Sequence, residues 1–311
     1  MTKEKKYLIV IDSNSIIHRA FHALPPLKKK NGEIVNAVYG FLLVFIKAIQ
    51  DFKPSYIVAT FDLPKPTFRH KKYKEYKGKR EKSPEELYSQ IPKIKEFLKL
   101  FKVPIVEKEG FEADDIIGTV SRIVPKKDPK IETIILSGDL DVLQLVNNKT
   151  KVFTLRKGVK DIILYDDKLV KERFGGLGPE QLIDYKGLRG DPSDNIPGVV
   201  GIGEKTAINL LLEFKTLENI YKNIAKTKNI SERIKKSLLD NKKMAFLSKE
   251  LAEINVKTPI DIKIEDCEWG VYDKNKVMEM LDEYEFFNIK KRFIEMIREE
   301  NKLIGENLKL W

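Results

Sequence analysis

The chain has 311 residues and a formal net charge of +11, from 58 lysine and arginine residues against 47 aspartate and glutamate residues. A single cysteine, Cys267, excludes a disulfide framework and a cysteine-based zinc site, and three histidines are too few for a histidine metal cluster. No apolar segment approaches the ~20 residues of a membrane-spanning helix, and the N-terminus lacks a signal-peptide pattern. We therefore expect about two domains, no membrane, a monomer in the cytoplasm, and an anionic partner such as nucleic acid.

The first half of the chain alternates short apolar runs with amphipathic segments. Strands are expected at residues 7–11, 56–61, 103–106 and 131–136, and helices at residues 37–49, 84–101 and 113–124. This alternation predicts an α/β fold with a mostly parallel central sheet covered by helices. After about residue 167 the strand pattern stops and short helices follow, so we expect a domain boundary there.

Much of the basic surplus lies in residues 65–82, where nine lysine and arginine residues face two acids. Phe68, Tyr73 and Tyr76 lie among these bases. Basic groups neutralise phosphates and aromatic faces stack on unpaired bases, so this segment is expected to contact nucleic acid. A solvated basic loop is the alternative interpretation.

Acidic residues recur where the predicted strands end. Asp12, Asp62 and Asp139 follow three of the strands at their carboxyl ends, where α/β sheets place their sites. The complete set of candidate acids is Asp12, Asp62, Glu112, Asp114, Asp115, Asp139, Asp141, Asp191 and Asp194. So many carboxylates repel one another unless cations neutralise them, and oxygen ligands without histidine or cysteine suit Mg²⁺ or Mn²⁺. Each acid alone could instead be a helix cap or a turn residue.

A glycine-rich turn at residues 198–207 leads into a helix expected at residues 208–214. Glu204 stands where a P-loop requires lysine, and Thr206 stands where a dinucleotide fingerprint requires glycine. Glycines allow close backbone approach, and the free N–H groups of the following helix can bind phosphate. The pattern predicts a helix-hairpin-helix that contacts a DNA backbone, and an ordinary helical turn is the alternative. The residues expected to bind are Gly198, Gly201, Gly203, Lys205 and Thr206.

Seven short motifs occur in register along the chain. They lie at residues 12–24, 37–41, 61–70, 76–80, 110–115, 137–141 and 190–203. In this combination the chain resembles the bacterial 5′→3′ exonuclease and flap endonuclease family over about residues 8–293, as a stand-alone nuclease or an isolated domain. The resemblance implies a PIN-like 5′ nuclease domain at residues 1–167 with a helical arch at about 65–101. It also implies a helix-hairpin-helix (helix-three-turn-helix) DNA-binding domain at 168–256, and C-terminal helices at 257–311 that pack back on the nuclease domain.

The resemblance also implies site residues and two metal ions per active site. The first metal site matches Asp12, Asp62, Glu112 and Asp114, the second matches Asp139, Asp141 and Asp191, and the additional acids of the family match Asp115 and Asp194. Lys77 and Arg80 match arch bases that reach the scissile phosphate, and Arg19 approaches the substrate from the first helix. Arg69, Tyr73 and Tyr76 of the arch are expected to contact DNA, and K⁺ is expected to assist the hairpin.

Together these features predict a structure-specific 5′→3′ exonuclease and 5′ flap endonuclease. It would hydrolyse DNA phosphodiester bonds by a two-metal mechanism at a 5′ single-stranded flap or a nick, in replication (primer removal) and repair. The alternatives are a PIN-like ribonuclease acting on RNA and a non-catalytic DNA-binding module. The first would lack the arch and the hairpin, and the second would show gaps in the acid set.

Overall fold

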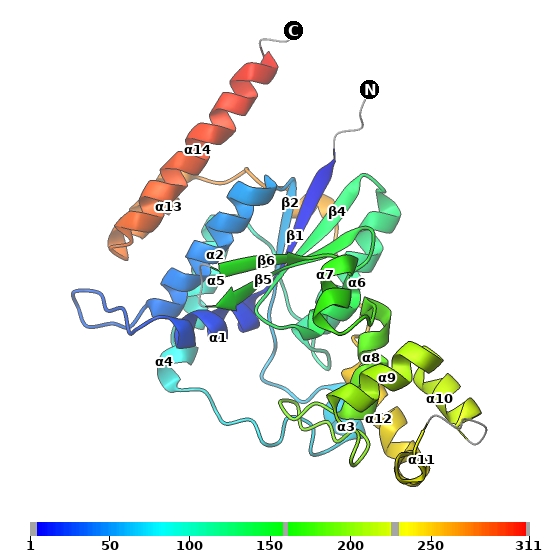
Figure 1. Ribbon diagram of the computed structural model, residues 1–311. Coiled ribbons are helices and arrows are strands. Elements are labelled where there is room, and N and C mark those ends of the chain that lie inside the picture. Colours follow the sequence, from blue (N-terminus) through cyan, green and yellow to red (C-terminus); the bar gives the residue numbers. More distant parts are fainter. Residues whose placement is uncertain (1–4, 158–160, 225–229, 309–311) are drawn as a thin grey trace.

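A six-stranded sheet forms the centre of the computed structural model, which describes residues 5–157, 161–224 and 230–308 (Figure 1). The strand order is β3-β2-β1-β4-β5-β6. The strands are β1 Lys6–Asp12, β2 Tyr56–Thr60, β3 Ile105–Val106, β4 Ile131–Ser137, β5 Thr150–Lys157 and β6 Asp161–Tyr165. All neighbours are parallel except β5 and β6, which are antiparallel. The expected mostly parallel α/β sheet is confirmed, and it is extended by two strands that the sequence pattern did not predict.

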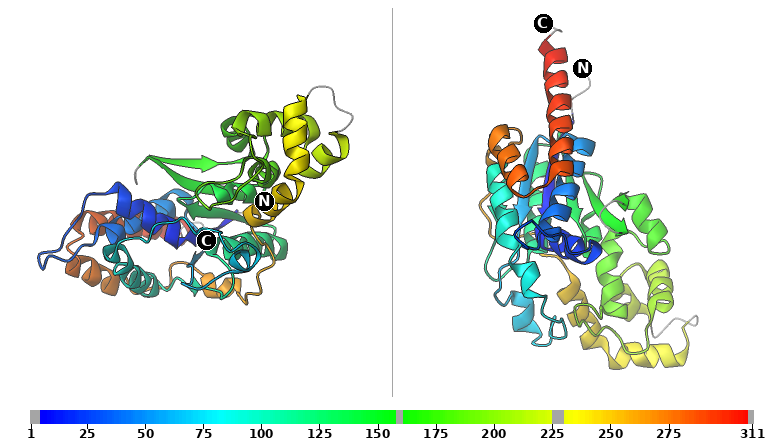
Figure 2. Two further views of the ribbon diagram at one scale, coloured as in Figure 1. Left: turned by 90° about the horizontal axis from the view of Figure 1, so that it is seen from below. Right: turned by 90° about the vertical axis from the view of Figure 1, so that its left-hand side faces the viewer.

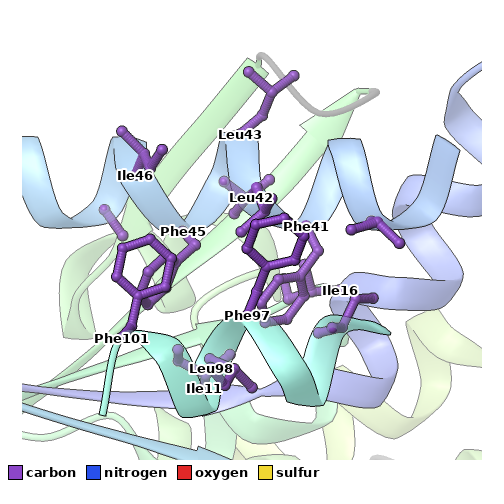
Figure 3. Close-up of a cluster of buried hydrophobic side chains, with 14 of the residues drawn as sticks. Ile11, Ile16, Phe41, Leu42, Leu43, Phe45, Ile46, Phe97, Leu98 and Phe101 are labelled. Carbon is purple, nitrogen blue, oxygen red and sulfur yellow. The ribbon is translucent and has the colours of Figure 1, made fainter. Parts of the chain in front are cut away.

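Helices cover both faces of the sheet, and the alternation of side chains along β1 separates two cores. Ile9 and Ile11 point into a cluster formed with α1 (Ser13–Ala23), α2 (Asn36–Phe52) and α5 (Ile91–Leu100). Figure 3 shows Phe41 and Phe45 of α2 directed toward Phe97 and Phe101 in this cluster. Leu8 and Val10 of β1 point to the opposite face, against α6 (Ala113–Lys127). This two-sided burial explains why β1 is an uninterrupted apolar run.

The helix expected at residues 84–101 is divided into α4 (Glu85–Tyr88) and α5. Gln90 at the junction is fully buried, and its side-chain oxygen accepts hydrogen bonds from the Ala37 and Val38 backbone N–H groups at 2.8 and 3.3 Å. These bonds satisfy donors at the start of α2 that have no partner within that helix. The apolar positions Leu87 and Ile94 are still buried together, so the expected face is preserved across the break.

A second group of helices follows the sheet and has its own core. It comprises α8 Leu182–Arg189, α9 Glu204–Phe214, α10 Leu217–Asn223, α11 Glu232–Asp240 and α12 Lys242–Ala252. Leu188, Leu211 and Leu217 are fully buried in this core. The preceding helix, α7 (Asp167–Arg173), instead packs through Val170 into the cluster on the α6 face of the sheet. We call α8–α12 the helical part, and Figure 2 shows it at the opposite end of the molecule from α14.

The chain then returns to the sheet and ends in two helices, α13 (Lys274–Glu283) and α14 (Phe287–Leu308). Val277 of α13 and Phe293 of α14 are fully buried in the same cluster as α2. The C-terminal helices therefore pack on the sheet-containing part. Across the described ranges, no helix combines the length and apolarity needed to cross a membrane.

Candidate active site

Five of the candidate acids line one pocket of about 570 Å³ at the carboxyl ends of the central strands. They are Asp12, Asp62, Glu112, Asp114 and Asp139. Asp12 is the last residue of β1, and Asp62 and Asp139 each lie two residues beyond the end of a parallel neighbour. Parallel pairing places these three chain ends side by side, while α6 brings the remaining two acids from its first turn. The pocket therefore arises from strand order, as the sequence pattern predicts.

Hydrogen bonds orient these carboxylates. Asp12 caps α1 by accepting a bond from the Ser15 backbone N–H at 3.2 Å, and its other oxygen accepts one from the Ser137 hydroxyl at 2.5 Å. Asp62 accepts a bond from the Ala113 backbone N–H at 2.8 Å. The carboxylates of Asp12 and Asp62 are thus oriented by groups at the ends of neighbouring elements, namely α1, β4 and α6.

The ionised form of two pocket carboxylates is unfavourable unless a cation neutralises it. Burial raises the pKa of Asp12 to about 6, and the Asp62 and Asp139 carboxylates add to this effect. Burial and the carboxylates of Asp12 and Asp139 also raise the pKa of Asp114 well above its ordinary value. A divalent cation relieves both effects, and a donor set made only of oxygen fits Mg²⁺ or Mn²⁺. Within the described ranges, no three acid, histidine or cysteine side chains already form a coordinating group, so the carboxylates would have to turn inward around an ion.

Asp141 and Asp191 occupy a neighbouring pocket of about 310 Å³, where Lys186 of α8 lies between them. The Lys186 ammonium is 2.7 Å from Asp191 Oδ2 and also pairs with Asp141. Burial and the neighbouring Asp139 raise the pKa of Asp141 to about 7. Burial acts in the same direction on Asp191, but Lys186 and Ser193 outweigh it and lower that pKa to about 2. The sequence pattern gave no sign of Lys186, since a lysine five positions before an acid is common on a helix.

Asp115 does not belong to the pocket, contrary to the expectation. It is fully buried, and its two oxygens lie 2.8 Å from the two terminal nitrogens of Arg69. Arg69 is itself 2% exposed and also donates to the Leu251 carbonyl at 3.0 Å. In this structure the Asp115 carboxylate and the Arg69 guanidinium are therefore occupied by internal contacts, and neither side chain lines the pocket. The pair instead joins α6 and α3 (Phe68–Lys72) to the end of α12.

The segment between α3 and α4, which is part of the expected helical arch, consists of turns and irregular chain and contains no helix. It brings Lys77 and Arg80 to the pocket as expected. The Lys77 ammonium is 3.0 Å from Glu112 Oε1, and an Arg80 guanidinium nitrogen is 2.6 Å from Asp194 Oδ1. Asp194 is bound to the arch and does not line the pocket, which contradicts its expected place among the pocket acids. Tyr76 is 3% exposed, so its ring is not available in this structure for the expected contact with DNA.

The opposite wall of the pocket is formed by α1. Arg19 lines it as expected and donates to the Leu155 carbonyl at 3.1 Å. His18 and His22, one turn apart on the same helix, also line the pocket. Neither histidine was predicted, because three scattered histidines do not form a metal cluster. The signal that could have found them is their helical spacing beside Arg19, on the helix that begins directly after Asp12. Tyr73, the other expected stacking residue, is half-buried and its hydroxyl donates to Glu75 at 2.9 Å.

The glycine turn forms an exposed hairpin before α9. Gly201 has a φ of 78° and open space where a side chain would lie, and α9 begins at Glu204 without a side-chain cap. Lys205 is exposed and Thr206 half-buried in the first turn of α9, so backbone N–H groups and a cation face outward together. Gly203 is also exposed. Gly198 differs, because it is buried and a Cβ there would lie 2.2 Å from the Gly190 nitrogen. Its expected contact with DNA is therefore replaced by a packing role.

Comparisons with known proteins cover most of the chain. Residues 7–175 match a family model described as the 5′-3′ exonuclease N-terminal resolvase-like domain, and residues 177–275 match the 5′-3′ exonuclease C-terminal SAM fold. DNA polymerase I of Bacillus subtilis (strain 168) is 42% identical over 289 residues, which cover 93% of this chain and 32% of that protein. DNA polymerase I of Bacillus caldotenax is 41% identical over 302 residues, covering 97% and 34%. The chain thus spans about a third of the length of these curated relatives.

Solved structures share the fold. A structure of T5 5′-exonuclease with bound divalent metal ions (zinc) has a TM-score of 0.67 at 18% identity, covering 94% of this chain and 99% of that one. A complex of T5 D15 flap endonuclease with DNA and metal ions has the same score, identity and coverage. The catalytic core of Rad2 in complex with DNA substrate has a TM-score of 0.59 at 20% identity, covering 94% and 93%.

Proposed function

Because this chain belongs to the 5′-3′ exonuclease family, we propose that it cuts DNA phosphodiester bonds near a 5′ end, as a 5′→3′ exonuclease and 5′ flap endonuclease. One observation carries the proposal: five acids at the ends of the central strands share a pocket with Lys77 and Arg80. Carboxylates alone repel a phosphodiester, but they can bind the cations that a phosphodiester needs beside it. The two bases can then bind the phosphoryl oxygens directly.

The proposed ion ligands fall into two sets. Asp12, Asp62, Glu112 and Asp114 would hold one Mg²⁺ or Mn²⁺, and Asp139, Asp141 and Asp191 would hold a second. Such ions, when bound, supply activation of water and stabilisation of the charge on the phosphoryl group. The metal ions in the T5 structures support divalent metal dependence. For Asp141 and Asp191 to serve in this way, Lys186 has to withdraw from between them.

The remaining site residues would bind and orient the substrate. Lys77 would exchange Glu112 for a phosphoryl oxygen, and Arg80, one nitrogen of which is bound to Asp194, would offer its remaining N–H groups to the phosphoryl oxygens. Arg19 would hold the strand from the opposite wall. The exposed hairpin, with the N–H groups of α9 and Lys205, would bind the duplex backbone without reading bases. The K⁺ ion expected at this hairpin stays a prediction.

The proposed substrate is DNA with a 5′ single-stranded flap or a nick, and the proposed setting is primer removal and repair by a monomer. The DNA present in the T5 and Rad2 complexes supports DNA as the substrate. The test is cleavage of an end-labelled 5′ flap, a nicked duplex and a single-stranded RNA, each with Mg²⁺ and with EDTA. Cleavage of the DNA substrates only in Mg²⁺ is expected. Preferential cleavage of RNA would favour a ribonuclease, and binding without cleavage would favour a non-catalytic module.

A further inference from the structure

Residues 75–80 of the arch, which we call the strap, are bound to the loop at residues 191–196, which connects α8 to α9 in the helical part. The Lys77 backbone N–H donates to the Asp194 carbonyl at 2.9 Å, and the Asn195 side-chain amide donates to the Glu75 carbonyl at 2.7 Å. The Arg80 guanidinium donates to Asp194 Oδ1 at 2.6 Å. The two segments are more than 110 residues apart in sequence, so these bonds fix tertiary position and not local conformation.

Tyr76 joins the strap to both the loop and the acidic pocket. Its ring is buried in a small apolar cluster with Ile196 and Leu251. Its hydroxyl lies 3.1 Å from Glu112 Oε2 and 3.1 Å from Asp194 Oδ2. A phenol has one hydrogen and can donate it to only one of these carboxylates at a time. Tyr76 thus bridges the pocket acid Glu112 and the loop acid Asp194, and the neighbouring Lys77 ammonium lies 3.0 and 3.9 Å from the same two carboxylates.

The backbone on both sides of this junction adopts conformations that ordinary residues avoid. Lys77 has a φ of 54° and Asn195 a φ of 56°, both in the left-handed region. Each makes a hydrogen bond between strap and loop, as described above. Non-glycine residues remain in this region when the surrounding structure over-determines them. The strap is therefore held in place by its contacts with the loop.

We propose that Tyr76 and Asp194 are positioning residues. They hold Lys77 and Arg80 beside the carboxylate pocket and connect these two bases to the helical part. This inference rests on the proposed function, because it gives the nuclease a link between the DNA-binding hairpin and the arch bases. It assigns Asp194 to the arch instead of to a metal ion. Movement of the helical part on duplex DNA would then move the strap, since the two are joined by side-chain and backbone hydrogen bonds.

The kinetic test uses Tyr76→Phe, which keeps the buried ring, and Asp194→Asn, which keeps the shape. Each should lower kcat on a 5′ flap by on the order of tenfold, the loss expected for one hydrogen bond to a charged group. Duplex affinity measured in EDTA and the Mg²⁺ concentration for half-maximal rate should not change. The double variant should be no slower than the slower single variant, because both remove one junction. A several-fold rise in the half-saturating Mg²⁺ concentration for Asp194→Asn would make that residue a metal ligand and overturn the inference.

A second test needs no activity. Hydrogen–deuterium exchange of the full metal-free chain should be faster at the Lys77 amide, which donates to the Asp194 carbonyl, in both variants. Asn195→Ala should have the same effect. The matched control Tyr221→Phe removes a tyrosine hydroxyl bond to the Leu238 carbonyl at 3.0 Å within the helical part, and should leave the strap unchanged.

The two tests separate the inference from the proposed function. If wild-type protein cuts no DNA, the proposed function fails, while faster exchange at the strap still supports the junction. If Tyr76→Phe, Asp194→Asn and Asn195→Ala all leave strap exchange at the wild-type rate, the inference is overturned even where the wild-type protein is an active nuclease.

Discussion

Replacing Asp12 with asparagine should stabilise the metal-free protein, although it removes a proposed metal ligand. Asp12 is 4% exposed, and its pKa is raised from 3.8 to about 6 by burial and by the neighbouring carboxylates. A folded-state pKa above the unfolded value means that stability falls as pH rises through this window. At about 1.4 kcal/mol per pKa unit, ionised Asp12 costs the metal-free fold up to about 3 kcal/mol at neutral pH. Asparagine keeps an oxygen for the Ser15 N–H and removes this cost.

Asp191→Asn provides a matched control of opposite sign. Burial acts to raise the pKa of Asp191, but Lys186 and Ser193 outweigh it and lower the value to about 2. Ionised Asp191 therefore stabilises the fold above pH 4, by about 2 kcal/mol, and this contribution is lost as pH falls through the folded-state pKa. Neutralising Asp191 should lower the free energy of unfolding by about that amount at pH 7. Both variants remove one carboxylate from the proposed metal sites, so a simple loss of charge cannot explain opposite results.

The assay is urea unfolding followed by circular dichroism at pH 7, in EDTA and in Mg²⁺. In EDTA the free energy of unfolding should rise for Asp12→Asn and fall for Asp191→Asn. Mg²⁺ should stabilise the wild-type protein by binding the folded state and should stabilise Asp12→Asn less. A lower stability of Asp12→Asn in EDTA would refute the view that burial and the neighbouring carboxylates make ionised Asp12 unfavourable in the metal-free fold.

Four further changes have defined outcomes. Asp139→Asn should abolish Mg²⁺-dependent cleavage and leave duplex affinity in EDTA intact, and retained turnover would contradict the metal assignment. Lys77→Ala should lower kcat with little change in duplex affinity, whereas a loss in affinity alone would make Lys77 a steering residue. Lys205→Ala should weaken binding equally across DNA sequences and reduce the salt slope by about one, and a sequence-dependent effect would argue against backbone binding. The half-saturating Mg²⁺ concentration should rise as pH falls below about 7 and again below about 6, where Asp141 and Asp12 become protonated, and a flat profile would place ion binding elsewhere.

The parts of the fold that depend on local pattern were predictable. The first four strands are short apolar runs, and parallel pairing follows from the helices between them, so acids after these strands had to meet at one edge. The sequence pattern did not predict β5 or β6, because lysine, threonine and arginine interrupt the apolar positions of β5, and β6 is a short strand at the edge of the sheet. A run of this kind does not differ clearly from a loop.

The roles of single side chains depended on contacts that no local pattern contains. Arg69 appeared to be one base of a basic segment, yet it is buried because its partners include the carbonyl of Leu251, 182 residues away. Tyr76 is likewise buried because Ile196 and Leu251 of the helical part pack against its ring. Lys186 was not noticed because its significance comes only from the two carboxylates that the fold brings beside it. The type of each residue therefore indicated what chemistry it could perform. Its contacts in the folded chain decided whether it lies where that chemistry is needed.

The most direct test of the proposed function is single-turnover cleavage of a 5′-flap DNA by the wild-type protein, with Mg²⁺ added after mixing in EDTA. We expect the flap to be released only after Mg²⁺ addition, with a 5′ phosphate on the product strand. No cleavage in either Mg²⁺ or Mn²⁺, or cleavage that proceeds equally in EDTA, would contradict the assignment of the carboxylate pocket as the active site of a metal-dependent 5′ nuclease.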